Sequence, residues 1–192
     1  MKRFALALGI LGLAAPLAMA QASTWAIDPA HSEVAFSIKH MQLSNVRGHF
    51  GVAKGTIVYD GAKIGNSSVN VTIDVTSVDS GNSARDNHLK TDSFFDVAKF
   101  PTATFVSTGV TKSGSKLEVA GNLTLHGITK PVVLEVEPSG TPIESQMDHK
   151  MHVGYSATTT LKRADFAIGT TFPEAVLGAD VPLTIDLEAV KQ

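Results

Sequence analysis

Seven histidines are the most obvious candidates for metal binding or acid–base chemistry in the sequence. His149 and His152 lie three residues apart, and the others are scattered along the chain: His31, His40, His49, His88 and His126. On a β-strand, side chains three residues apart point to opposite faces, so the pair can share one ion only if the local structure is a turn. The sequence therefore predicts no metal site.

Arg85, Asp86 and His88 form a second candidate, because together they offer an anion clamp, an acid and a base. A carboxylate beside an imidazole fixes the tautomer of the ring and raises its pKa. One hypothesis is an enzyme that uses these three side chains. The simpler interpretation is the solvated surface and cap of a helix. The sequence contains no Gly-x-Ser-x-Gly elbow, phosphate-binding loop or dinucleotide fingerprint, so we expect no cofactor.

Composition excludes further classes of protein. The 192 residues include no cysteine, which rules out disulfides, zinc–thiolate sites and cysteine nucleophiles. Lys and Arg number 16 against 18 Asp and Glu, and no long run of either sign occurs. Without a basic footprint for phosphate backbones, nucleic acid is not an expected partner.

The N-terminus has the pattern of a targeting segment. Lys2 and Arg3 precede the 12-residue stretch Phe4–Ala15, and Ala18-Met19-Ala20 provides a small-x-small cleavage motif. A membrane anchor is the alternative, but a helix needs about 20 apolar residues to cross a bilayer. We therefore expect Met1–Ala20 to be a cleaved secretory signal and residues 21–192 to form a single domain.

The remaining chain alternates apolar and polar residues with a period of two, which is typical of strands with one dry face. The clearest example is Ser67–Asp79, where Val69, Val71, Ile73 and Val75 alternate with polar residues. Similar patterns occur in further segments: Val34–Ile38, Thr102–Val110, Leu117–Leu125, Val132–Val136, Met151–Leu161 and Val181–Leu187. The glycine-interrupted stretch Asn45–Asp60 is either a strand pair or one bent strand with bulges.

These segments predict an all-β fold of about eight strands. Short turns such as Asp60-Gly61 and Lys112–Ser115 join the strands, so neighbours should be antiparallel. Eight such strands can close into a barrel that points every apolar face into one interior. A two-sheet sandwich is the main alternative. An outer-membrane barrel would need two aromatic girdles, which one Trp and two Tyr cannot supply.

One connection, Ser80–Pro101, is too long for a hairpin turn and should contain one or two short helices. Ser93 and Asp96 have the spacing of a helix start, and Pro101 should end the element. The segment also carries Phe94, Phe95 and Phe100, which need burial. It is expected to plug one barrel end or to act as a lid over a cavity mouth.

Longer motifs resemble those of a known family. Its central signature is matched by the stretch from Arg85-Asp86-Asn87-His88-Leu89-Lys90 through Phe94–Val97 to Phe100–Phe105, and its second signature by Leu123–Val132. Shorter matches are Asp28–Ser32, Asn45–Phe50 and Arg163–Gly169. On these motifs, which span about Thr24 to Val190, the chain is identified as similar to the YceI-like family of bacterial periplasmic proteins.

The resemblance implies an extended, lipocalin-like eight-stranded antiparallel barrel with a short helical segment near residues 82–100. It also implies a periplasmic, non-enzymatic carrier that holds a polyisoprenoid or another long-chain amphiphilic lipid in its interior. It allows a homodimer and transient contact with a membrane. Under the alternative enzyme hypothesis, Arg85, Asp86 and His88 would act on a lipid-like substrate.

The apolar phase of the strands gives the expected lining of such a cavity: Phe36, Ile38, Ile57, Tyr59, Val71, Ile73, Phe105, Leu123, Leu125, Val153, Tyr155, Leu183 and Ile185. Phe94 and Phe95 should lie at its mouth, and Arg85, His88 and Lys130 are candidates for a polar head group. Ordinary core packing is the alternative for each apolar residue, because side chains can fill a small barrel.

Overall fold

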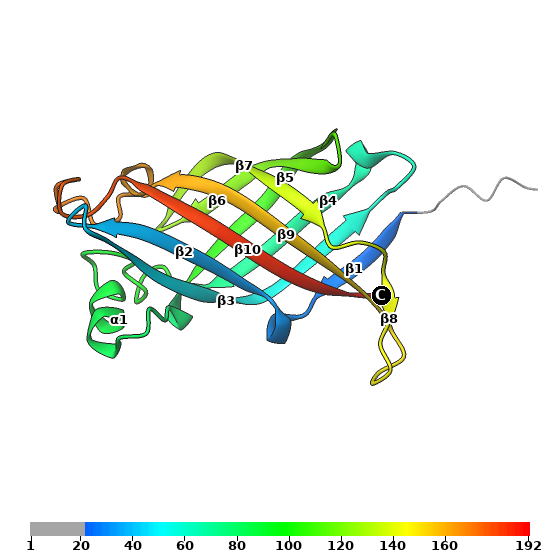
Figure 1. The fold of residues 1–192 in the computed structure, drawn as a ribbon, viewed down its shortest axis with the longest axis horizontal. Coiled ribbons are helices and arrows are strands. Elements are labelled where there is room, and N and C mark those ends of the chain that lie inside the picture. Colours follow the sequence, from blue (N-terminus) through cyan, green and yellow to red (C-terminus); the bar gives the residue numbers. More distant parts are fainter. Residues whose placement is uncertain (1–21) are drawn as a thin grey trace, which may run out of the picture.

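The computed structural model describes residues 22–192, and in this range the strands form one ten-stranded antiparallel sheet (Figure 1). The strands are β1 (Ser23–Ile27), β2 (Glu33–His40), β3 (Ser44–Tyr59), β4 (Ser68–Asp74), β5 (Thr102–Ser113), β6 (Lys116–Leu125), β7 (Ile128–Pro138), β8 (Ile143–Glu144), β9 (Met151–Lys162) and β10 (Asp180–Lys191). Short 3₁₀ helices are η1 (Pro29–His31), η2 (Ile64–Asn66), η3 (Val75–Ser77) and η4 (Arg163–Phe166). The predicted signal, Met1–Ala20, lies outside the described residues.

Eight of the described strands close into a barrel, which confirms the predicted fold class. The order β2-β3-β4-β5-β6-β7-β9-β10 closes because β10 pairs with both β9 and β2. The short strands extend two positions of the barrel. β1 pairs with β10 and β3, the same two neighbours as β2, so β1 and β2 occupy one position in the barrel wall on either side of η1. β8 pairs with β9.

The segment after Asn45 is one bent strand rather than a strand pair. β3 has 16 residues and pairs with β2 along its first half and with β4 along its second half. Its register against β4 shifts between Val52 and Lys54. This irregularity lets one long strand follow the curved wall, since a bulge increases local twist and bend.

The long connection Ser80–Pro101, which follows η3, contains the α-helix α1 (Ser83–Leu89) and a series of turns. The helix starts earlier than Ser93, because the side chain of Asn82 caps it by accepting a hydrogen bond from Arg85 N at 3.0 Å. The predicted helix start at Ser93 is wrong. Asp96 has a left-handed φ of 43°, which a right-handed helix cannot propagate through.

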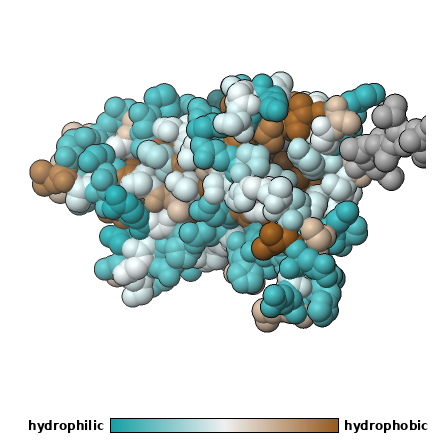
Figure 2. Space-filling view, turned by 45° about the vertical axis from the view of Figure 1, so that its right-hand side comes forward, coloured by the Kyte–Doolittle hydropathy of each residue, from teal (hydrophilic) through white to brown (hydrophobic). Residues whose placement is uncertain are grey.

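The apolar phase of the strands points into the barrel, as predicted from their alternation. Val71, Phe105 and Val153 are each less than a tenth exposed. On the outside, Figure 2 shows hydrophilic residues over most of the visible face, with hydrophobic residues in separate patches. Among the described residues, no helix has the length and apolar character needed to cross a membrane.

The turn between β3 and β4 depends on one buried carboxylate. Asp60 accepts hydrogen bonds from the backbone N–H groups of Ala62 and Lys63 and from the side-chain amide of Asn66, at 2.8–3.0 Å. The bond from Asn66 and these backbone bonds hold the pKa of Asp60 below its ordinary value of 3.8.

Because the pKa is lowered in the folded state, the ionised carboxylate stabilises the fold at neutral pH, and this stabilisation is lost as pH falls through the folded-state pKa. We expect Asp60→Asn to melt at a lower temperature than the unsubstituted protein at neutral pH, with the difference shrinking below pH 3.8. Thermal melts followed by circular dichroism across this range measure the effect. A difference that stays constant with pH would contradict the assignment.

Candidate functional site

A cavity in the barrel interior has a volume of about 130 Å³. We call it cavity 1, and it lies at the barrel end that carries α1. Eight residues expected from the sequence line it: Phe36, Ile38, Ile73, Phe94, Phe95, Leu123, Leu125 and Leu183. Residues absent from that expectation complete the wall: Val34, Phe50, Val75, Leu89, Ala103, Leu161, Arg163, Phe166, Ile168, Leu177 and Val181.

The second cavity, cavity 2, has a volume of about 60 Å³ and lies toward the end that carries η2. Four expected residues line it: Ile57, Tyr59, Tyr155 and Ile185. Burial raises the pKa of Tyr155, so its hydroxyl stays neutral. Tyr59, which is 37% exposed, Ser67 and Ser68 also border this cavity, but the surface that lines it is apolar. The Ser67 hydroxyl accepts a hydrogen bond from Asp60 N.

Three expected lining residues, Val71, Phe105 and Val153, contact neither cavity and belong to the packed core. Val71 and Phe105 are paired across β4 and β5, between Ile73 of cavity 1 and Val69 of cavity 2. They therefore form a layer between the two cavities.

Phe105 can fill this layer because residue 121 has no side chain. A Cβ atom at Gly121 would lie 2.7 Å from Cε2 of the Phe105 ring, which is inside van der Waals contact. The ring therefore lies over the β6 backbone, in the layer between the two cavities.

An ordered loop after β9 covers the outer end of cavity 1. The buried Arg163 guanidinium donates hydrogen bonds to the backbone carbonyl oxygens of five residues in this loop: Ile168, Gly169, Phe172, Leu177 and Gly178. Sequence reasoning missed this residue, although Arg163 continues the inward phase of Leu161 and an arginine at an inward position was a detectable signal. Its charge is satisfied by carbonyl dipoles, so it is not available to a ligand.

The aromatic residues of the α1 connection meet this loop. The Phe94 ring stacks on Phe172 with ring centroids 5.4 Å apart, and Phe95 packs edge-on against Phe50 at 5.2 Å. The β2–β3 turn joins the same cover, because Met41 N donates to Val176 O and Gly178 N donates to Lys39 O. Three segments distant in the sequence therefore close one end of the barrel.

The polar residues selected from the sequence do not line either cavity. Arg85 donates to the hydroxyl and carbonyl oxygens of Ser80, and Asp86 accepts from the same serine. The His88 ring packs edge-on against Phe94, and Lys130 is exposed on β7. Arg85 and Asp86 thus hold the start of α1 instead of facing a shared reaction centre with His88.

Phe105→Ala should join the two cavities and cost about 3–5 kcal/mol of unfolding free energy, because it leaves a cavity in packed core. Val106→Ala is the matched control, since Val106 is the outward neighbour and is 46% exposed. Urea denaturation measures both, and a crystal structure of Phe105→Ala would show the joined space. Equal losses in the two variants would contradict the assigned position of Phe105.

Arg163→Met should lower stability by about 3 kcal/mol, because buried carbonyl groups lose a charged donor. Lys162→Met is its control, since Lys162 is exposed and pairs only with Asp180 at the surface. Hydrogen exchange of residues 166–178 should accelerate in Arg163→Met alone. Unchanged protection of this loop would show that Arg163 does not hold it.

Comparison with known proteins agrees with this architecture. Residues 25–189 match the YceI-like domain family. Full-length relatives include a protein YceI of Salmonella newport, 38% identical, and a UPF0312 protein of Vibrio parahaemolyticus, 37% identical, each aligned over 100% of both chains.

Solved structures share the fold. Burkholderia cenocepacia BcnA has a TM-score of 0.75 and 25% identity, covering 84% of this chain and 98% of that one. A Campylobacter jejuni YceI protein has a TM-score of 0.69 and 35% identity, covering 80% and 90%. A domain from Saccharophagus degradans, described as polyisoprenoid-binding, is 19% identical with a TM-score of 0.61 over 88% and 98%, so its likeness concerns the fold. On the family match and these full-length relatives, the chain belongs to the YceI-like family.

Proposed function

We propose that this protein is a periplasmic, non-enzymatic carrier of a long-chain isoprenoid or a similar amphiphilic lipid. The observation that carries the proposal is the interior of the closed barrel, where cavity 1 is walled by apolar side chains and by one arginine whose donors are already used. Such a wall offers hydrophobic contact and no free hydrogen-bonding group, so it favours a hydrocarbon chain over a polar metabolite.

The polar end of such a lipid would lie at cavity 2. Ser67, Ser68 and the partly exposed Tyr59 border this end of the interior, although the surface that lines cavity 2 is apolar. An apolar tail would match the chemistry of both cavity walls, and a head group would lie outside them at this end. A chain that extends through both cavities requires the Phe105 ring to move off Gly121.

The dimensions of the barrel suit a long chain. β9 and β10 have 12 residues each. Strands of this length run about 40 Å, and a tilt of about 40° gives a barrel about 30 Å tall. This height matches the hydrocarbon thickness of a bilayer, which is about 30 Å.

The energetics favour exchange with a membrane over release into water. Burial is worth about 0.8 kcal/mol per methylene, so a long chain gains tens of kcal/mol gross relative to water. Non-covalent binding free energies do not exceed about −20 kcal/mol, so the entropy lost when the lipid becomes ordered must offset the rest of this gain. A bilayer offers the lipid a comparable apolar environment, so transfer between the two is nearly balanced, as a shuttle requires.

Binding is preferred to catalysis because the Arg85, Asp86 and His88 side chains are separately engaged. Two of them bond Ser80 and the third packs on Phe94. The likeness to the Saccharophagus degradans domain supports a barrel able to hold a polyisoprenoid, while the choice of ligand for this chain depends on its own cavities.

Leu183→Trp should reduce binding of octaprenol at least tenfold, because the larger side chain fills cavity 1. Thr184→Trp is the matched control, since it adds the same ring at an outward position next along β10. Native mass spectrometry after incubation with octaprenol, on protein expressed from the full chain and purified from the periplasmic fraction, measures occupancy. Equal binding by both variants would refute an interior site, and absence from that fraction would refute export.

A further inference from the structure

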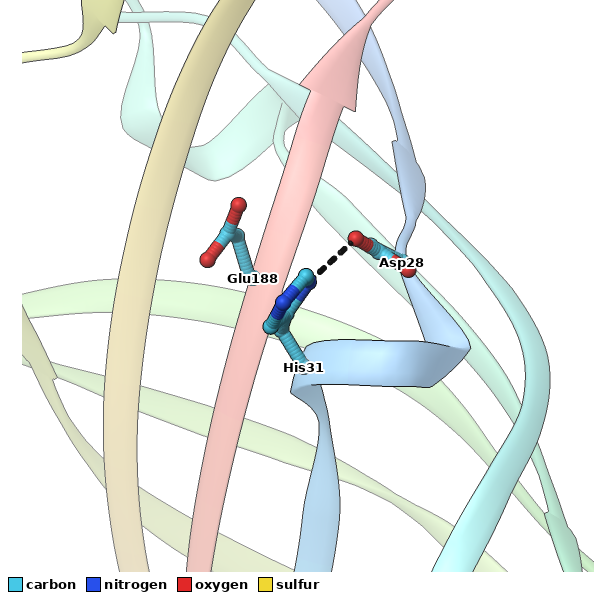
Figure 3. A group of neighbouring side chains, drawn as sticks. All are labelled: Asp28, His31 and Glu188. Atoms are coloured by element: carbon cyan, nitrogen blue, oxygen red, sulfur yellow. Dashed lines mark hydrogen bonds and ion pairs between the residues drawn. The ribbon is translucent and has the colours of Figure 1, made fainter. Parts of the chain in front are cut away.

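Two imidazoles and three carboxylates gather on the outer wall of the barrel, away from both cavities. They come from the two ends of η1 (Asp28 and His31), the turn before β9 (Asp148), β9 itself (His152) and β10 (Glu188). Figure 3 shows three of them, with Asp28 and His31 side by side and Glu188 projecting from the adjacent strand.

The inner three residues have the spacing of a metal-binding group. His31 Nδ1 lies 2.7 Å from Asp28 Oδ2, and one ligand atom from each of Asp28, His31 and Glu188 lies within 4.8 Å of the other two. Ligand atoms around a tetrahedral zinc ion lie about 3.4 Å apart, so this set would have to draw closer together to coordinate an ion. The His31 side chain is 66% exposed, which gives an ion direct entry from solvent.

Backbone hydrogen bonds hold Asp28 and Glu188 in place without an ion. Asp28 N donates to Glu188 O at 2.8 Å, and Glu188 N donates to the hydroxyl of Ser32 at 3.0 Å. Asp28 also caps η1 by accepting from Ala30 N at 2.9 Å, and Pro29 fixes the first turn. Asp28 and His31 at the two ends of η1 are therefore held against β10 at Glu188.

An outer partner orients Glu188. His152 Nδ1 lies 2.6 Å from Glu188 Oε1, and its Nε2 lies 3.2 Å from Asp148 Oδ2. The His152 side chain is only 16% exposed. Paired imidazoles and carboxylates behind the ligands are the usual outer support of protein metal sites.

We propose that Asp28, His31 and Glu188 bind a divalent transition-metal ion of the zinc class, with His152 as a positioning residue acting through Glu188. One imidazole nitrogen with two carboxylate oxygens suits Zn²⁺, whereas Mg²⁺ and Ca²⁺ are held by oxygen ligands alone. Solvent water completes the coordination at the exposed side. The ion links η1 to β10 at the boundary between β1 and β2.

The test is isothermal titration of untagged protein with Zn²⁺, supported by the visible absorption of bound Co²⁺. We expect one ion per chain, at least tenfold weaker binding in His31→Ala and in Glu188→Gln, and loss of the Co²⁺ band in both. His149→Ala is the matched control. This histidine lies in the β8–β9 hairpin near His152, its side chain is 80% exposed, and it is not one of the proposed ligands.

His152 is tested by a pair of variants. His152→Ala should weaken Zn²⁺ binding about 10–100-fold, while His152→Asn keeps a donor for Glu188 and should recover most of the affinity. Near-ultraviolet circular dichroism of each metal-free variant checks the fold. The proposal is overturned if no saturable binding of one ion occurs, or if His149→Ala loses as much affinity as His31→Ala. Octaprenol binding by His31→Ala should be unchanged, so this site and the lipid proposal fail independently.

Discussion

The pairing of β10 with both β9 and β2 is the constraint on which the rest of the structure depends. The β9–β10 ladder runs from Asp180 opposite Lys162 to Val190 opposite His152, and the pairing of β10 with β1 and β2 brings the two ends of the described chain together. Closure removes sheet edges and points every apolar strand face into one interior. Since the chain contains no cysteine, no disulfide contributes to its stability, and this ladder and the core beneath it hold the fold together.

Closure alone leaves the barrel open at its ends, and the two ends are handled differently. At one end, Arg163 organises the loop after β9 with hydrogen bonds to backbone carbonyls, while Phe94 and Phe172 stack beneath it. At the other, Tyr59 and the serines after η2 border a smaller cavity whose lining is also apolar. Both cavities therefore suit the hydrocarbon part of an amphiphilic lipid.

Local sequence signals predicted the wall of the barrel well and its cover poorly. Period-two alternation identified residues such as Ile73, Leu123 and Leu183, because each strand residue reports its own face. Phe166, Ile168 and Leu177 were missed because they lie in irregular backbone, where no period relates position to direction. The alternation along β5 also could not predict that Phe105 divides the interior, because this position depends on the missing side chain of Gly121 on the neighbouring strand.

The sequence by itself determined the fold class, the inward face of the strands that it predicted and, through long motifs, the YceI-like family. These properties follow from near neighbours along the chain. Tertiary structure alone decided which polar groups meet. Arg85 and His88, three residues apart, are engaged by different partners, whereas Glu188, separated from Asp28 and His31 by about the whole domain, has a ligand atom within 4.8 Å of theirs. The physical reason is that barrel closure sets the distances between side chains on different strands, and separation along the chain does not.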